Sequence, residues 1–337
     1  MNLIRLVSVT LLIIGVPLQV WAVDSTEVTS STEKVSQQQT EVIACRSKNF
    51  SFSLGASMGL ASGEARELVY YTADWPPFQD GDTMSELVWD LDNAVMAGGF
   101  ISASIKDRLF FSLEALTRVS GGGDHMTDKD WLIVRDEWSH YSESPTDLEK
   151  GLIIDLQASY AFVKSNYVAL RAILGYQYDN WHWKNHGGYY IYSTGGGWRN
   201  DTGTWPDDEV GIEYEQKIHL PYAGLGIDVF ICDSFSRSAY GHYSYVFAKT
   251  EDHHRQRVPE LVVEDDFSGL NCYMVGGAIR WQFYRGLFLL ASFDYLEILE
   301  GEGDGTYTQG GVSTKYDDNA GMALKTYTGS LSLGYEF

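Results

Sequence analysis

The sequence predicts an all-β protein, a ten-stranded antiparallel transmembrane β-barrel with strands that extend above the membrane. Three observations support this fold class. From about Lys48 onward, apolar and polar residues alternate with a period of two, as expected of strands with one apolar face. Short and long polar connections also alternate along the chain. After residue 22, no stretch approaches the roughly 18 apolar residues of a membrane-spanning helix, so an embedded chain has to cross as a barrel.

The alternation is clearest in three segments, residues 50–58, 152–162 and 326–337. In each segment one face is apolar or aromatic, and the other is mostly small or polar, as the lumen of a barrel would be. The last segment ends on Phe337, and a C-terminal strand that ends in Phe resembles the pattern of Gram-negative outer-membrane barrels.

The connections set the strand count. Short turns are expected at residues 106–108, 164–166, 232–236 and 284–286, and long polar loops near 73–85, 121–149, 184–208, 250–267 and 300–320. Four turns and five loops join ten strands. A strand of about 20 residues tilted by ~45° gives about 47 Å of height, whereas the lipid-facing band needs about 25 Å. We therefore expect the loop ends of the strands to stand above the outer membrane.

Two segments precede the barrel. A basic residue, an apolar run and small residues before position 23 predict a signal peptide over residues 1–22. Residues 23–47 are rich in Ser, Thr, Gln and Glu, which predicts a disordered segment. The barrel domain is expected at 48–337.

Charge and cysteine content exclude two classes of protein. The chain has 24 Lys and Arg against 46 Asp and Glu, a formal net charge of −22, so we expect no nucleic-acid partner. Its three cysteines are Cys45, Cys232 and Cys272. An odd number in an exported protein leaves at least one thiol unpaired and argues against a dense disulfide framework.

Two short motifs bring ionisable side chains together. In a strand, residues i and i+2 share a face about 6.6 Å apart, so Asp128 converges with Asp130, and Asp252 with His254. Both motifs are expected at the loop ends of strands. A histidine paired with an aspartate can take a proton from water, and a carboxylate pair can share a proton and hold that water. The four residues therefore suit peptide hydrolysis without a Ser or Cys nucleophile.

Other interpretations of these motifs stay open. Charged loop residues are often only solvated, and the barrel would then be a catalytically silent adhesin or structural protein. A metal site is a further alternative, with oxygen and nitrogen ligands. Its candidate ligands are Asp124, His125, Asp128, Asp130, Asp252, His253 and His254. Their spacing matches no diagnostic metal motif, so we expect no metal.

Several stretches together resemble the omptin family of outer-membrane proteases. They are DKDW at 128–131, the Asp-x-His motif at 252–254, SGEARELVYY at 62–71, GYQY at 175–178, GGYYIYST at 187–194 and YEQKIHLPYAGL at 214–225. The resemblance covers roughly Phe50 to Phe337. It implies an aspartic-type endopeptidase of the Gram-negative outer membrane, with its active site on the extracellular side and with peptide or protein substrates cut near basic residues.

The resemblance also implies roles for the motif residues. Asp128 and Asp130 match the family's aspartate couple, and Asp252 and His254 match its His-Asp dyad. In omptins these four residues flank the nucleophilic water.

Further positions match the family's substrate pocket. Glu67 matches an acidic residue that takes the basic side chain before the scissile bond, and Met126 and Ile212 match apolar positions that line the cleft. The pocket's second acidic residue falls at Thr250, which puts the preference for Arg or Lys in doubt. The neighbouring Glu251 is expected to face the opposite way.

Omptins also need lipopolysaccharide, held by basic residues on the outer face. Tyr176 is kept here, Lys217 replaces an arginine, and Asn180 stands where another arginine is expected. Lipopolysaccharide is therefore the expected lipid partner and activator, but whether it is required stays open. We expect no other cofactor and a monomeric protein.

Overall fold

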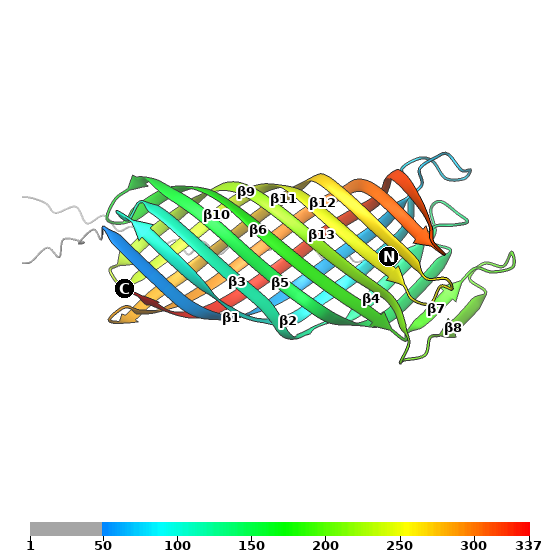
Figure 1. Ribbon diagram of the computed structural model, residues 1–337, viewed down its shortest axis with the longest axis horizontal. Helices are drawn as coiled ribbons and strands as arrows, with labels where there is room; N and C mark the ends of the chain where they lie inside the picture. Colours follow the sequence, from blue (N-terminus) through cyan, green and yellow to red (C-terminus); the bar gives the residue numbers. More distant parts are fainter. Residues whose placement is uncertain (1–48) are drawn as a thin grey trace, which may run out of the picture. The chain divides into compact units, whose positions relative to one another are not determined.

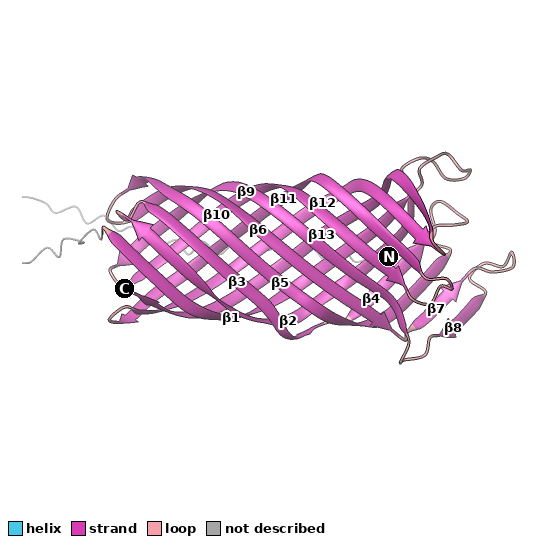
Figure 2. Ribbon diagram, in the orientation of Figure 1, coloured by secondary structure: helices cyan, strands magenta, loops and turns pink. Residues whose placement is uncertain are grey.

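The protein is described by a computed structural model, which covers residues 49–337. The chain divides into two units, residues 1–44 and 45–337. The expected signal peptide, the whole of the expected disordered segment and Cys45 lie outside the described residues. Every regular element of the described part is a strand (Figure 2). The strands are β1 (Phe50–Tyr70), β2 (Thr83–Ile105), β3 (Leu109–Gly122), β4 (His125–Asp130), β5 (His140–Lys164), β6 (Val168–His186), β7 (Tyr189–Tyr192), β8 (Asp201–Thr204), β9 (Val210–Cys232), β10 (Phe235–His254), β11 (Leu261–Tyr284), β12 (Leu287–Gln309) and β13 (Val312–Glu336).

The strands of residues 49–337 close into a ring of antiparallel pairs (Figure 1). The order runs from β1 through β2, β3, β5, β6, β9, β10, β11, β12 and β13, and β13 pairs again with β1. Strands β3 and β4 share one place in the ring, because each pairs with both β2 and β5. β7 and β8 form a hairpin that pairs with β5 outside the ring. The ring therefore has ten places, which confirms the predicted ten-stranded barrel.

A glycine-rich break separates β3 from β4. Gly121 and Gly122 have φ values of +68° and +99°, a region that favours glycine. At Gly123 a Cβ atom would lie 2.0 Å from the carbonyl oxygen of Thr146, so a larger residue would have to displace the backbone. After this break the chain rejoins the ladder as β4, which carries Asp128 to the rim.

The four short turns fall close to their expected places. The segment 121–149 was expected to be one loop, and this is wrong in part, because it contains β4 and residues 140–149 of β5. The segments 250–267 and 300–320 were expected to be loops, and this is wrong. Residues 255–260 and 310–311 are the only parts of them outside strands. Above the membrane both strand faces can be polar, because backbone pairing in the ladder does not depend on an apolar face. Gly310 and Gly311, with φ of +59° and +80°, form the tight turn between β12 and β13.

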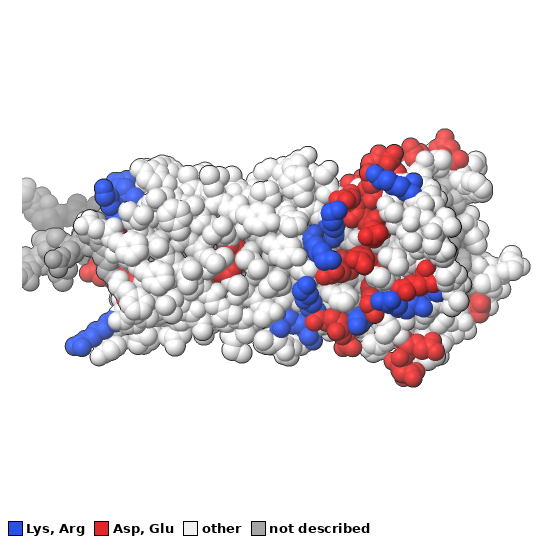
Figure 3. All heavy atoms as spheres, in the orientation of Figure 1, with Lys and Arg blue, Asp and Glu red and all other residues white. Residues whose placement is uncertain are grey.

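The outer surface has an apolar band and a charged end. Large apolar side chains point outward in the half of the barrel near the short turns, among them Met58, Leu174, Leu225 and Leu331. On the face drawn in Figure 3, acidic and basic residues gather toward the end that carries β4, β7 and β8. This distribution fits a barrel whose apolar band faces lipid and whose charged end stands above it. No helix among the described residues is long and apolar enough to cross a membrane.

An aromatic cluster fills the lumen below the charged end. Trp89, Trp181, Trp183 and Tyr214 are fully buried, and the ring centroids of Trp89 and Tyr214 lie 5.5 Å apart. In the ladder Trp89 pairs with Met126, two positions below the pair of Leu87 with Asp128. The cluster therefore forms an apolar floor beneath the residues at the rim.

Candidate active site at the barrel rim

Asp252 and His254 share the inner face at the top of β10. His254 Nε2 lies 2.8 Å from Asp252 Oδ2. Asp252 is only 2% exposed, whereas the His254 side chain remains partly accessible. A histidine whose Nε2–H donates to a carboxylate keeps Nδ1 as a proton acceptor. The pair has the arrangement of an oriented general base.

Asp128 and Asp130 share the inner face of β4. Ser85 on β2 lies opposite Asp130 in the ladder, and its hydroxyl donates a hydrogen bond to Asp128 Oδ1 at 3.4 Å. Desolvation and the charge of Asp130 raise the pKa of Asp128 well above its usual range. Desolvation also raises the pKa of Asp130, although Ser85 and nearby cations oppose this rise. Such a pair tends to hold a proton at neutral pH.

The two motifs act on each other electrostatically across the rim. The negative charge of Asp252 contributes to the raised pKa of Asp128, after desolvation and Asp130. His254 is among the positive charges that limit the rise at Asp130. The structure thus brings all four predicted residues to one end of the lumen, from strands more than 100 residues apart in sequence.

An acidic pocket lies next to the dyad. Glu67 on β1 is 4% exposed, and the negative charge of Asp252 acts on it. Desolvation, followed by the charges of Asp252 and Asp265, raises the pKa of Glu67 well above its usual range. Thr250 is also buried here, and its hydroxyl donates a 2.8 Å hydrogen bond to Asp265 Oδ2.

Sequence reasoning did not identify Asp265. It lies on β11, which pairs with β10, and its partner in the ladder is Thr250. The signal was present, because the buried residues Leu261, Val263, Asp265 and Phe267 alternate with the less buried Val262, Glu264 and Asp266. The segment 250–267 was expected to be a loop, and the two-residue period of side-chain direction applies only to strands.

The two apolar positions expected in the cleft belong to the same lumen cluster. Met126 is fully buried, and Ile212 is partly buried against that cluster. The backbone N–H groups of Gly211 and Ile212 donate to Asn185 Oδ1 at 3.1 and 2.7 Å. Asn185 therefore fixes the start of β9, where Ile212 faces His254 in the ladder.

The residues expected to contact lipopolysaccharide lie on β6 and β9, away from the rim pocket. The Tyr176 hydroxyl and His219 Nδ1 are 2.5 Å apart, and Tyr176 is 42% exposed. Lys217 Nζ lies 2.7 Å from Glu215 Oε2, and Asn180 Nδ2 donates to Glu215 Oε1 at 2.8 Å. The charge of Lys217 is therefore largely balanced by a neighbouring carboxylate.

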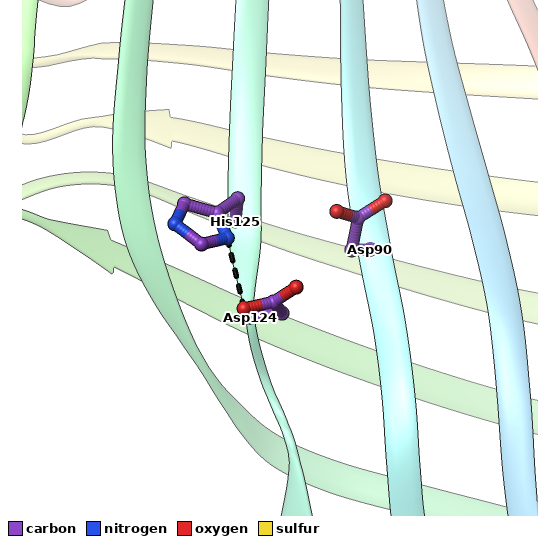
Figure 4. A group of neighbouring side chains, drawn as sticks. All are labelled: Asp90, Asp124 and His125. Carbon is purple, nitrogen blue, oxygen red and sulfur yellow. Dashed lines mark ion pairs between the residues drawn. The ribbon is translucent and has the colours of Figure 1, made fainter.

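The seven candidate metal ligands do not form one group. Asp128, Asp130, Asp252 and His254 face the lumen, whereas His253 binds Glu251 and Glu260 on the other face of β10. Within residues 49–337, the one group of three with metal-ligand spacing is Asp90, Asp124 and His125 (Figure 4). In this group His125 Nδ1 lies 2.8 Å from Asp124 Oδ1, and both are exposed.

Comparisons with known proteins agree with this architecture. The Omptin family model matches residues 48–337. The chain is 28% identical over 295 residues to the plasminogen activator of Yersinia pestis, covering 85% of this chain and 90% of that protein. It is 32% identical over 172 residues to the outer membrane protease OmpP of Escherichia coli strain K12, covering 50% of this chain and 53% of OmpP.

A solved structure has the same fold. The crystal structure of the outer membrane protease OmpT from Escherichia coli matches with a TM-score of 0.79 at 22% identity, covering 85% of this chain and 97% of OmpT. The family match spans the whole described barrel, and relatives in that family are named outer-membrane proteases. The chain therefore belongs to the omptin family of Gram-negative outer-membrane proteases.

Proposed function

We propose that this protein is an endopeptidase that cleaves peptides and proteins near basic residues, with a water molecule as the nucleophile. The observation that supports this most strongly is the convergence of the Asp252–His254 pair with Asp128 and Asp130 at one rim. The protein's membership of the omptin family favours an orientation in which this rim faces the cell exterior. Substrates would then enter from solution.

His254 is the proposed general base. Its Nδ1 takes a proton from water while the water oxygen bonds to the carbonyl carbon of the scissile peptide. Asp252, 2.8 Å from Nε2, stabilises the resulting imidazolium. The same proton then passes to the leaving amine as the C–N bond breaks.

Asp128 and Asp130 are proposed to position that water. Their raised pKa values favour a singly protonated pair, which can both accept a hydrogen bond from the water and donate one to it. If both carboxyls were ionised, their two negative charges would repel each other. If both were protonated, the pair would lose the carboxylate, which is the stronger hydrogen-bond acceptor.

Glu67 is proposed to select a basic residue before the scissile bond. It is a buried carboxyl beside the dyad, so binding the side chain of an Arg or Lys would place that residue's own carbonyl, the one in the scissile bond, near the water. Met126 and Ile212 would contact the apolar part of the same side chain. Lipopolysaccharide is proposed as an activator that contacts the outer face near Tyr176 and Lys217.

The test is cleavage of a peptide with paired basic residues by refolded protein, with and without lipopolysaccharide. His254→Ala and Asp128→Asn should each lower kcat by about 10²–10⁴-fold. His125→Ala is the matched control, because this exposed histidine lies outside the lumen, and it should cleave like the wild type.

Three results would oppose the proposal. Undiminished cleavage by His254→Ala would remove its chemical basis. Loss of cleavage with a chelator, restored by a divalent ion, would favour a metal hydrolase. A wild-type barrel that is folded but cleaves no member of a peptide library, with or without lipopolysaccharide, would favour an adhesin or structural role.

A further inference from the structure

Several buried oxygen atoms near Glu67 have no hydrogen-bond partner among the described residues. They include Glu67 Oε2 on β1, Asp265 Oδ1 on β11 and Asn319 Oδ1 on β13. Each of these side chains is at most 6% exposed. Buried acceptors are nearly always paired, so three unpaired acceptors in one region suit a ligand that supplies donors.

Two of these acceptors lie next to the same glycine, and the third is electrostatically coupled to one of them. Asp265 lies opposite Gly305 of β12 in the ladder. A Cβ atom on Gly305 would lie 3.1 Å from Asp265 Oδ1 and 3.3 Å from Asn319 Oδ1, so both oxygens lie next to this glycine. Desolvation raises the pKa of Glu67 most, followed by the negative charges of Asp252 and then Asp265.

The region around Glu67 has a surplus of buried carboxyl groups over basic side chains. In the part of the chain from 49 to 337, neither Glu67 nor Asp265 forms an ion pair with Lys, Arg or His. Asp266, the next residue, has an exposed side chain and instead binds Lys249 at 2.8 Å. A buried carboxyl pair without a counter-ion is suited to a cationic ligand that supplies donors.

Thr250 binds one of the two oxygens of Asp265. Its hydroxyl donates a hydrogen bond to Asp265 Oδ2. Asp265 Oδ1 therefore remains available as an acceptor, like the unpaired oxygens of Glu67 and Asn319. Thr250 and Asp265 are direct partners in the β10–β11 ladder, so a carboxylate on either one can reach the same pocket. Thr250, the position at which the family's second acidic residue is absent, is thus paired directly with the acidic residue Asp265.

We propose that Asp265 is the second acidic residue of the specificity pocket and, together with Glu67 and Asn319, binds an arginine side chain of the substrate. This inference rests on the proposed endopeptidase function and identifies its preferred side chain. A guanidinium has five N–H donors in a planar fork and can reach acceptors on three strands at once, whereas an ammonium is a point charge with three donors. Arg is therefore preferred over Lys.

The titration of Asp265 is consistent with this role. Desolvation raises the pKa of Asp265 to about 7, opposed by Thr250 and supported by Asp252. Other groups that act on the pocket are Asp128, Tyr214 and Tyr307. A bound guanidinium stabilises the ionised carboxylates, so binding releases protons and strengthens as pH rises through about 7.

The experiment compares Asp265→Asn with Asp266→Asn on three peptides that differ only before the scissile bond. They carry Arg, Lys or citrulline, an uncharged isostere of Arg. In Asp265→Asn, kcat/KM for the Arg peptide should fall by about 30-fold or more, while the citrulline peptide changes little. Asp266→Asn should keep the wild-type ratio. Thr250→Asp in the Asp265→Asn background should recover part of the Arg preference.

A binding measurement separates this inference from the hydrolytic mechanism. Benzamidine binding is titrated by calorimetry in His254→Ala and in the double variant His254→Ala/Asp265→Asn. A Kd at least tenfold weaker in the double variant supports the pocket, even if no peptide is cleaved. Equal Kd values, or an unchanged Arg to citrulline ratio in Asp265→Asn, overturn the role of Asp265. In that case, loss of cleavage by His254→Ala alone would leave the proposed mechanism standing.

Discussion

His254 Nε2 and Asp252 Oδ2 lie 2.8 Å apart at the top of β10, with the carboxylate buried and the imidazole partly accessible. This arrangement follows from the two-residue period of a strand, which places both side chains on the inner face. The second Asp252 oxygen has no partner among the described residues, and the negative charge of Asp252 raises the pKa of Glu67, after desolvation. Asp252 therefore links the proposed general base to the proposed specificity pocket.

Asp252→Asn should impair the general base while preserving the shape of the site. The amide can no longer stabilise a positive charge on His254, so we expect kcat to fall by about 10²-fold or more with a smaller change in KM. Steady-state kinetics on an Arg-containing peptide provide the measurement. Glu264→Gln, an exposed carboxylate on β11, is the control. Equal kcat for wild type and Asp252→Asn would contradict the assigned role.

Asp265→Asn should stabilise the barrel at high pH. The pKa of Asp265 is raised in the fold to about 7, so its contribution to stability is fully present only below about pH 4, the usual pKa of an aspartate. That contribution is lost as pH rises through about 7. We expect the variant to exceed the wild type by roughly 1–4 kcal/mol at pH 8 and to match it near pH 4. Urea unfolding in lipid vesicles at both pH values measures the difference. An equal difference in unfolding free energy at both pH values would show that the ionisation of Asp265 is not the cause.

Glu215→Gln should strengthen the interaction with lipopolysaccharide. Lys217 is now balanced by Glu215 at 2.7 Å, and Asn180 adds no charge. Removing the carboxylate frees one positive charge, worth about 1 kcal/mol near an anionic lipid surface, or about fivefold in affinity. The lipopolysaccharide concentration for half-maximal activity is the readout, and Lys217→Ala should shift it the opposite way. If both variants shift it equally in one direction, this surface is not the lipid site.

Trp89→Ala should destabilise the barrel and disturb the site above it. Trp89 is fully buried and stacks on Tyr214, so its loss leaves a cavity that costs about 3–5 kcal/mol. Trp75→Ala is the control, because Trp75 is 72% exposed and should cost less than about 0.5 kcal/mol. Unfolding free energies for the two variants test this. Equal losses would mean that the aromatic cluster is not the floor of the site.

Much of the fold could be predicted from local patterns. The alternation of residues 50–58, 152–162 and 326–337 indicates strands, and the short turns identify where they reverse. Loop boundaries were less predictable, as the segments 250–267 and 300–320 show. Charged, polar and glycine residues dominate both segments, so composition suggested loops, although the ladder extends through most of both segments.

The sequence by itself determined which residues share a face, because that depends only on the two-residue period of one strand. It therefore paired Asp128 with Asp130 and Asp252 with His254 before any tertiary contact was known. The tertiary structure alone decided which strands and registers meet. Asp265 reaches the pocket because β11 aligns it with Thr250 of β10, a pairing set by the closure of the whole barrel. No pattern within either strand encodes that register, so the second buried carboxylate became visible only in the folded chain.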